Sequence, residues 1–264
     1  MKKIIICATA RCGSTLLCKE LEASGVLGKP KEYYIQAKNT DAEKAPEFWK
    51  GVVQRGSSDN GVFAIKVMQQ QWPVVEKLHS YLKAPDSFLE TNLKKLKAIV
   101  TLKKNTIQMD SFYSFYKEAT WVFLRREDKL YQAISREMAR QTKVCHIIKP
   151  GASSATIGKA LEWEHAINYN ENAIYKPQTL LTHIQEICQE EANWLAFFKQ
   201  YKLKPLTVSY EVIVSSKQYL NDLARKVGVE INQIAEVPVM QVRNELNDEW
   251  AERFKQEFPD YQYR

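Results

Sequence analysis

Residues 2–24 read KKIIICATARCGSTLLCKELEAS, and the pattern of these residues predicts a strand, a turn and a helix in succession. Residues 2–8 form a short, apolar run rich in β-branched side chains, which predicts a buried strand. A turn of small residues follows, and residues 15–24 carry apolar side chains at helical spacing before Gly25 ends the helix. Backbone N–H groups in such a turn point inward, and the start of the helix adds a partial positive charge. The stretch therefore predicts a loop that binds a phosphate-like anion.

This loop differs from the loop of ATP- and GTP-binding enzymes. The Walker pattern requires a lysine immediately before its serine or threonine, and Ser14 occupies that position before Thr15. The fixed cation is instead Arg11, earlier in the loop. A sulfuryl group carries less negative charge than a phosphoryl group, so an arginine and a ring of amides could stabilise it without a metal. The alternative interpretation is a small-residue turn with an exposed arginine.

Further apolar runs predict three more strands, and helical periodicity fills most of the chain between them. The strands are predicted at residues 62–67, 120–124 and 206–210, and helices at 73–96, after 128, after 154, up to 228 and at 244–258. Pro177 marks an expected break, and residues 97–118 stay ambiguous. Strands that alternate with helices are typical of a parallel sheet with helical cover. We expect one α/β domain over residues 1–264, with a helix-rich insertion roughly at residues 150–203.

Composition narrows the class of protein. The chain is 45% hydrophobic and 26% charged, which is typical of a globular protein, and no apolar run approaches the roughly 18 residues of a membrane span. The net charge of +7 attracts anions, yet no basic patch is interleaved with aromatic residues, so we expect no nucleic acid as partner. Five irregularly spaced cysteines and four scattered histidines predict neither a disulfide framework nor a zinc site. A reducing, cytoplasmic compartment is the natural expectation.

Several motifs occur in one order along almost the whole chain. They are Arg11–Leu17, Ser24–Tyr34, Ala64–Met68, Arg126–Asp128, Gln132–Ser135, Gln141–Thr142, Val208–Glu211 and Asn247–Trp250. As a set, these motifs resemble the bacterial Stf0 (trehalose 2-sulfotransferase-like) family. The resemblance implies a P-loop NTPase-like sulfotransferase fold and 3′-phosphoadenosine 5′-phosphosulfate (PAPS) as the sulfuryl donor, with no metal. It further implies a hydroxyl of a carbohydrate or glycolipid as acceptor, and it leaves a homodimer open.

The resemblance also assigns residues to the donor. A guanidinium fork and a hydroxyl suit a phosphate, and by resemblance Arg126 and Ser135 grip the 3′-phosphate of PAPS. Arg125 is an alternative to Arg126, because the family has one arginine there, and either could instead pair with Asp128. The family's late arginine falls on Gln241, so Arg243 is the nearest candidate. The expected donor-binding residues are Arg11, Cys12, Gly13, Ser14, Thr15, Leu16, Arg126, Ser135, Tyr210 and Arg243.

Catalysis is expected from three residues. By resemblance Glu32 is the general base, a role that suits a carboxylate ionised at neutral pH. Arg11 and Lys66, at the end of a strand, would neutralise charge on the sulfuryl or leaving group. The alternatives are a surface glutamate and an ordinary strand-end lysine.

The expected acceptor contacts are Lys29, Pro30, Glu32, Tyr33, Tyr34 and Trp49, although aromatic residues are more often simply packed. The histidines are interpreted as ordinary surface or core residues. Two other functions stay open, a P-loop small-molecule kinase and a nucleotide-binding module that has lost catalysis.

Overall fold

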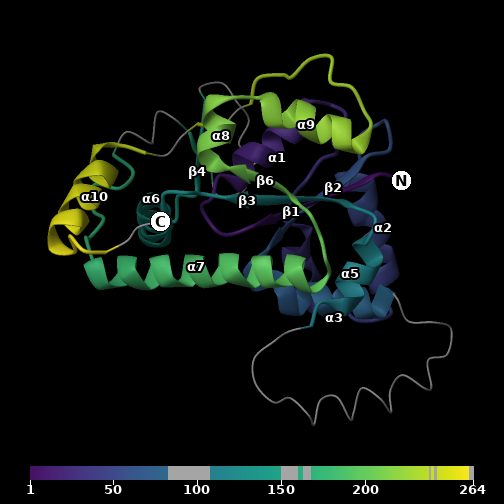
Figure 1. Cartoon of the computed structure of the whole chain (residues 1–264), viewed down its shortest axis with the longest axis horizontal. Helices are drawn as coiled ribbons and strands as arrows, with labels where there is room; N and C mark the ends of the chain where they lie inside the picture. Colours follow the sequence, from purple (N-terminus) through teal and green to yellow (C-terminus); the bar gives the residue numbers. More distant parts are fainter. Residues whose placement is uncertain (83–107, 150–159, 163–167, 238, 241–242, 262–264) are drawn as a thin grey trace, which may run out of the picture.

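The centre of the molecule is a parallel sheet in the order β2-β1-β3-β6 (Figure 1). The computed structural model describes residues 1–82, 108–149, 160–162, 168–237, 239–240 and 243–261. The four strands are β1 (Lys3–Ala8), β2 (Phe63–Met68), β3 (Thr120–Arg125) and β6 (Leu206–Ser209). In the central strand, Ile5 lies opposite Ile65 on one side and Trp121 on the other. The α/β class with a central parallel sheet is confirmed.

The two faces of the sheet bury alternate residues of each strand, as the period of two requires. Ile5 and Cys7 pack on one face, under a layer that includes Trp49, Trp194 and Phe197. That layer consists of η1 (Tyr33–Asn39), α2 (Ala45–Gly56), α3 (Trp72–Leu82), α5 (Asp110–Tyr116) and α7 (Pro177–Gln200). Ile4, Ile6 and Ala8 pack on the other face, against α1 (Ser14–Ala23), α8 (Tyr210–Ser215) and α9 (Gln218–Val227). Helices therefore cover both faces (Figure 1).

A third layer of packing lies beside the end of the main sheet. There α6 (Lys129–Thr142) packs against α7 and α10 (Glu245–Glu257), around a core that includes Ile134, Ile184 and Trp250. A second sheet, in the order β5-β4-β7, joins β4 (His146–Ile148) to β5 (Ala160–Glu162) in parallel and to β7 (Val239–Met240) antiparallel. The sequence did not predict this sheet.

Two predicted elements differ from the structure, and a third continues beyond the described residues. The last strand of the main sheet ends at Ser209, and Tyr210 begins α8, so the prediction of a strand through Tyr210 is wrong. Pro177 does not interrupt a helix but starts one, since its fixed φ suits the first position of the 24-residue α7. The helix expected at 73–96 is present as α3 up to Leu82, and its remainder lies outside the described residues, as do residues 97–107 and 150–159. The insertion at 150–203 stays a prediction.

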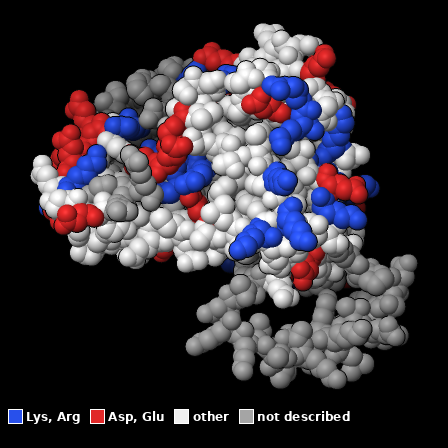
Figure 2. All heavy atoms as spheres, in the orientation of Figure 1, with Lys and Arg blue, Asp and Glu red and all other residues white. Residues whose placement is uncertain are grey.

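Charge is mixed on the face shown in Figure 2. Lysine and arginine side chains gather over one side of this face, and acidic side chains lie among them. Among the described residues visible there, no continuous surface of one sign develops, so the net charge of +7 is not concentrated on this face.

A buried carboxylate joins α6 to α7. Glu137 has no solvent-exposed surface, and Arg140 donates to its two oxygens at 2.7 and 2.6 Å. Gln141 donates to it at 2.6 Å, and His183 Nε2 lies 3.1 Å away. Burial opposes the charge, but the hydrogen bonds from Arg140, Gln141 and His183 outweigh it and lower the pKa of Glu137 to about 2. The ionised carboxylate therefore stabilises the folded state.

Replacing Glu137 by glutamine is expected to lower the free energy of unfolding at pH 7 by about 1–3 kcal/mol. In the wild type, ionised Glu137 contributes its full stabilisation above the unfolded carboxyl pKa of about 4.3, and this contribution decreases as the pH falls towards the folded pKa. The difference in stability between wild type and variant is therefore smaller at pH 3. Urea unfolding at both pH values measures it. The exposed Glu252→Gln on α10 is the control, and an equal deficit at both pH values would contradict the assignment.

Candidate active site

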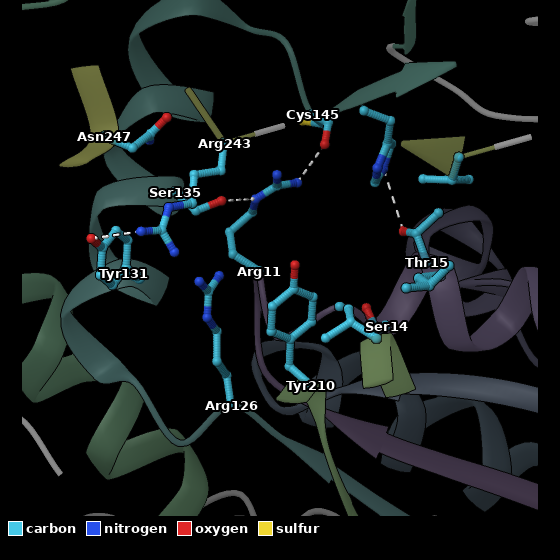
Figure 3. Close-up of a pocket in the computed structure, with 15 residues that line it drawn as sticks. Arg11, Ser14, Thr15, Arg126, Tyr131, Ser135, Cys145, Tyr210, Arg243 and Asn247 are labelled. Carbon is cyan, nitrogen blue, oxygen red and sulfur yellow. Dashed lines mark hydrogen bonds between the residues drawn. The ribbon is translucent and has the colours of Figure 1, made fainter. Parts of the chain in front are cut away.

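The loop between β1 and α1 opens into a pocket with a volume of about 140 Å³ (Figure 3). Gly13, Ser14, Thr15 and Leu16 form one wall of this pocket. Because α1 begins at Ser14, the first backbone N–H groups of this helix have no partner within the helix. Such a helix start favours an anion.

Two residues of the loop have left-handed backbone conformations, Arg11 with φ 65° and Gly13 with φ 86°. Only glycine fits at position 13, because a Cβ there would lie 2.5 Å from Cδ2 of Tyr210. The close approach of Tyr210 to the loop backbone closes one side of the pocket.

Gly13→Ala is expected to destabilise the protein by more than the about 1 kcal/mol of a left-handed alanine, since the new methyl group also displaces Tyr210. Gly25→Ala is the matched control. Gly25 also has a left-handed backbone, with φ 71°, but no atom lies within 4 Å of the position that a Cβ would take. This variant therefore loses stability only through the backbone strain of a left-handed alanine. Chemical unfolding measures the free energy of unfolding of both variants. Equal decreases would show that the Tyr210 side chain moves away from the new methyl group at no cost.

Three arginines face the pocket. The side chains of Arg11, Arg126 and Arg243 point into the same space from the loop, the end of β3 and the segment before α10 (Figure 3). Burial lowers the pKa of both Arg11 and Arg126, but a guanidinium stays charged in proteins. Three fixed positive charges in one cavity favour a ligand with several negative charges.

Arg11 is held from two sides. Its Nε donates to Ser135 Oγ at 3.0 Å, and its Nη1 donates to the carbonyl oxygen of Cys145 at 2.6 Å. Gln132, on the same helix as Ser135, donates to Thr9 Oγ1 and to the carbonyl of Ala10 at 2.9 and 2.8 Å. Helix α6 therefore fixes both the arginine and the loop that carries it.

Arg126 has an unused donor. Its guanidinium lies 4.5 Å from the centre of the Tyr210 ring, and only 9% of the residue is exposed. Its buried Nε has no hydrogen-bond partner among the described residues. A buried donor without a partner is costly. The Nε of Arg125 has no partner among the described residues either, but Arg126 lines the pocket, so only its Nε is placed to meet an acceptor atom of a ligand there.

The neighbouring Arg125 points elsewhere. Its Nη2 lies 3.6 Å from Oε2 of Glu191 on α7, and it does not line the pocket. Asp128, the acid that might have paired with either arginine, instead accepts the N–H of Tyr131 at the start of α6, at 2.9 Å. Of the two arginines, Arg126 is the one at the pocket.

Arg243 packs on the ring of Tyr131. The guanidinium lies 4.0 Å from the ring centre, and its Nε donates to Asp248 at 2.8 Å. The Tyr131 hydroxyl accepts a bond from Arg243 at 2.9 Å and donates to Asp248 at 2.8 Å. The position of Arg243 is therefore fixed by α6 and α10, and it closes the side of the pocket opposite Thr15 (Figure 3).

A second cluster lies on the β2 side of the loop. Lys66 Nζ forms an ion pair with Glu32 Oε1 at 2.7 Å and donates to Ser14 Oγ at 3.3 Å. Gln71 donates to the other oxygen of Glu32 at 3.1 Å. Burial opposes the charge of Lys66, but Cys18 and Glu32 outweigh it and raise its pKa. Lys66 is therefore a buried cation that connects the predicted base to the start of α1.

The other residues predicted to contact an acceptor lie mostly in the core. Tyr33, Tyr34 and Trp49 are buried, and the rings of Tyr34 and Trp49 stack with centres 6.1 Å apart. Pro30 is buried as well, whereas Lys29 is partly exposed and lies 3.8 Å from Asp59. Of this predicted set, Glu32 forms the ion pair with Lys66 of β2, and the acceptor contacts stay predictions. Of the predicted donor residues, only Cys12 does not line the pocket, because its side chain is buried beneath the loop.

Several pocket residues were not predicted. They are Tyr131, Cys145, His146, Val214, Val239 and Asn247. His146, which the sequence suggested to be an ordinary core or surface histidine, lies in the pocket wall, with its Nε2 3.4 Å from Thr15 Oγ1. Burial, with Arg11 and Lys66 nearby, lowers the pKa of His146 to about 3, so the ring is neutral at pH 7. The sequence could have predicted Tyr131, because it precedes the predicted Ser135 by four residues and therefore lies on the same face of the helix.

The described residues contain neither a cluster of metal-ligand side chains nor a membrane-spanning helix. In the described ranges, no three His, Cys, Asp or Glu side chains come together as metal ligands. None of the helices described here has the length and apolar character needed to cross a bilayer.

The chain is similar in sequence to known sulfotransferases. Residues 3–257 match the model of the Stf0 sulphotransferase family. The chain is 21% identical to the trehalose 2-sulfotransferase of Mycobacterium tuberculosis, over 98% of this chain and 96% of that protein. It is 23% identical to the trehalose 2-sulfotransferase of Mycolicibacterium smegmatis, over 96% of this chain and 94% of that protein. The chain belongs to the Stf0 sulphotransferase family.

Proposed function

We propose that the protein transfers the sulfuryl group of PAPS to a hydroxyl of a carbohydrate or glycolipid. Family membership supports sulfotransfer, and one observation carries the rest. A pocket with three arginines lies on one side of the β1–α1 loop, and the Glu32–Lys66 pair lies on the other side. Ser14 of the loop lines the cavity and accepts a hydrogen bond from Lys66, so the anion-binding cavity and the carboxylate are neighbours, as transfer between a nucleotide donor and a hydroxyl requires.

The pocket residues fit the anionic groups of PAPS. When bound, PAPS supplies an activated sulfuryl group on a nucleotide that also carries a 3′-phosphate. The start of α1 would hold the 5′-phosphosulfate through backbone N–H groups. Arg126, with its unused Nε, and Ser135 would hold the 3′-phosphate, with Arg243 nearby.

Glu32 would take the proton of the acceptor hydroxyl. The acceptor oxygen forms a bond to sulfur while the bond from sulfur to the bridging phosphate oxygen breaks. The products are a sulfate ester, adenosine 3′,5′-bisphosphate and the proton now on Glu32. Arg11 and Lys66 would stabilise the negative charge on the transferred and leaving groups, and most of the rate would come from positioning and electrostatics.

A sugar is the proposed acceptor because both relatives are named as trehalose 2-sulfotransferases. The low identities leave the choice of sugar to experiment. A cytoplasmic setting is part of the proposal, since the five cysteines are free.

Transfer of radiolabelled sulfate from PAPS to a panel of sugars and glycolipids, trehalose included, tests the proposal. We expect label in at least one acceptor, at the same rate with magnesium as with excess EDTA. Turnover of ATP that depends on magnesium would instead favour a kinase, although the loop lacks the Walker lysine. Tight binding of adenosine 3′,5′-bisphosphate without transfer to any acceptor would favour a binding module.

A further inference from the structure

Gln71 lies beside the proposed base and has a fixed orientation. It ends the short helix η2 (Gln69–Gln71), directly before α3, and 9% of its surface is exposed. Its Oε1 accepts the backbone N–H of Met68 at 3.1 Å. A backbone N–H can only donate, so this bond identifies the amide oxygen and turns the NH₂ group towards Glu32.

The NH₂ group of Gln71 meets a carboxylate oxygen that Lys66 does not reach. Lys66 lies 2.7 Å from Glu32 Oε1, and Gln71 Nε2 lies 3.1 Å from Oε2. Each carboxylate oxygen accepts about two hydrogen bonds, so each keeps one lone pair for another donor. Two donors on opposite oxygens fix the rotation of the carboxylate and leave it able to accept a proton.

Gln71 is itself held by rigid structure. The next residue, Trp72, is buried, and its ring packs against Trp194 of α7 with centres 5.3 Å apart. The Met68 N–H that orients the amide lies at the end of β2, in the same strand as Lys66. Both donors to Glu32 therefore come from the central sheet and the helix that follows it, which suits a site that must be held within a fraction of an ångström.

We propose that Gln71 is a positioning residue for Glu32, which holds the carboxylate in the orientation that receives the acceptor's proton. This inference rests on the proposed function. Among the described residues, the titratable groups that face Glu32 are Lys66 from β2 and Cys18 from α1. The pKa of Lys66 is raised, so its amine stays charged, and burial raises the pKa of Cys18 to about 12.

The Gln71→Glu variant tests this role, because glutamate has almost the same size and shape as glutamine. The new carboxylate can still accept the Met68 N–H, but it replaces a donor to Glu32 with a second negative charge. We expect the acidic limb of the pH profile of kcat/KM to move up by about 1–2 pH units, because two adjacent carboxylates share a proton. Gln71→Met, which only removes the donor, is expected to lower kcat about tenfold with KM nearly unchanged.

Gln70→Glu is the matched control, since Gln70 is exposed on the same turn. It is expected to keep the pH profile of the wild type. If the wild type transfers sulfate and Gln71→Glu keeps the wild-type profile, the inference is wrong. If the wild type transfers nothing, the proposed function itself fails. If Gln71→Glu does not fold, Gln71→Met decides, and an unchanged kcat overturns the positioning role.

Discussion

Replacing Glu32 by glutamine is expected to lower kcat for sulfate transfer by about 10³-fold, within the range lost when a general base is removed. Glutamine keeps the size of the side chain but cannot take a proton from the acceptor hydroxyl at neutral pH. Glu32 does not line the arginine pocket, so the affinity for adenosine 3′,5′-bisphosphate should change little. Steady-state kinetics with labelled PAPS, together with calorimetry, measure the two quantities separately.

Glu43→Gln is the control for the Glu32 variant, because Glu43 is an exposed glutamate eleven residues further along the chain. It is expected to have the kcat of the wild type. Two results would contradict the role of Glu32. A near-normal kcat would place the base elsewhere, and a raised KM with unchanged kcat would make Glu32 a binding residue only.

Replacing Arg126 by alanine is expected to raise the Kd for adenosine 3′,5′-bisphosphate by about 10–100-fold, the effect of losing a charge-assisted hydrogen bond. The affinity for ADP should change much less, because ADP has no 3′-phosphate. The buried Nε of Arg126, which has no partner in the described part of the chain, is the donor that this prediction assigns to the phosphate.

Arg125→Ala is the matched control for Arg126. The two arginines are adjacent and have the same charge, but Arg125 pairs with Glu191 outside the pocket. Its loss is expected to leave the Kd within about twofold of the wild type, apart from screened long-range attraction. Equal losses from both variants would mean that the pocket senses only net charge, and a larger loss from Arg125 would contradict the assignment.

The sequence predicted the parts of the site that follow directly from a strand. Arg11 and Arg126 follow the ends of β1 and β3, and Lys66 lies within β2, two residues before the end at which it was predicted; parallel strands bring these positions towards one edge of the sheet. The sequence could not decide between Arg125 and Arg126. Successive side chains of a strand point to opposite faces of the sheet, but this alternation does not indicate which face holds the pocket.

Other parts of the site depend on tertiary packing. The strands β4, β5 and β7 are two or three residues long, too short for a periodic pattern, and they bring Cys145, His146 and Val239 to the pocket. Tyr34 and Trp49 suit a sugar platform or a core equally well by sequence. Helices α3 and α5, which are distant in the chain from Tyr34, decide for the core.

Calorimetric titration of the wild-type protein with adenosine 3′,5′-bisphosphate and with ADP, both in EDTA, measures whether the arginine pocket recognises a 3′-phosphorylated nucleotide through the guanidinium of Arg126. We predict that adenosine 3′,5′-bisphosphate binds about 100-fold more tightly than ADP, a difference of about 2.7 kcal/mol. Equal affinities for the two nucleotides would mean that the pocket does not recognise the 3′-phosphate.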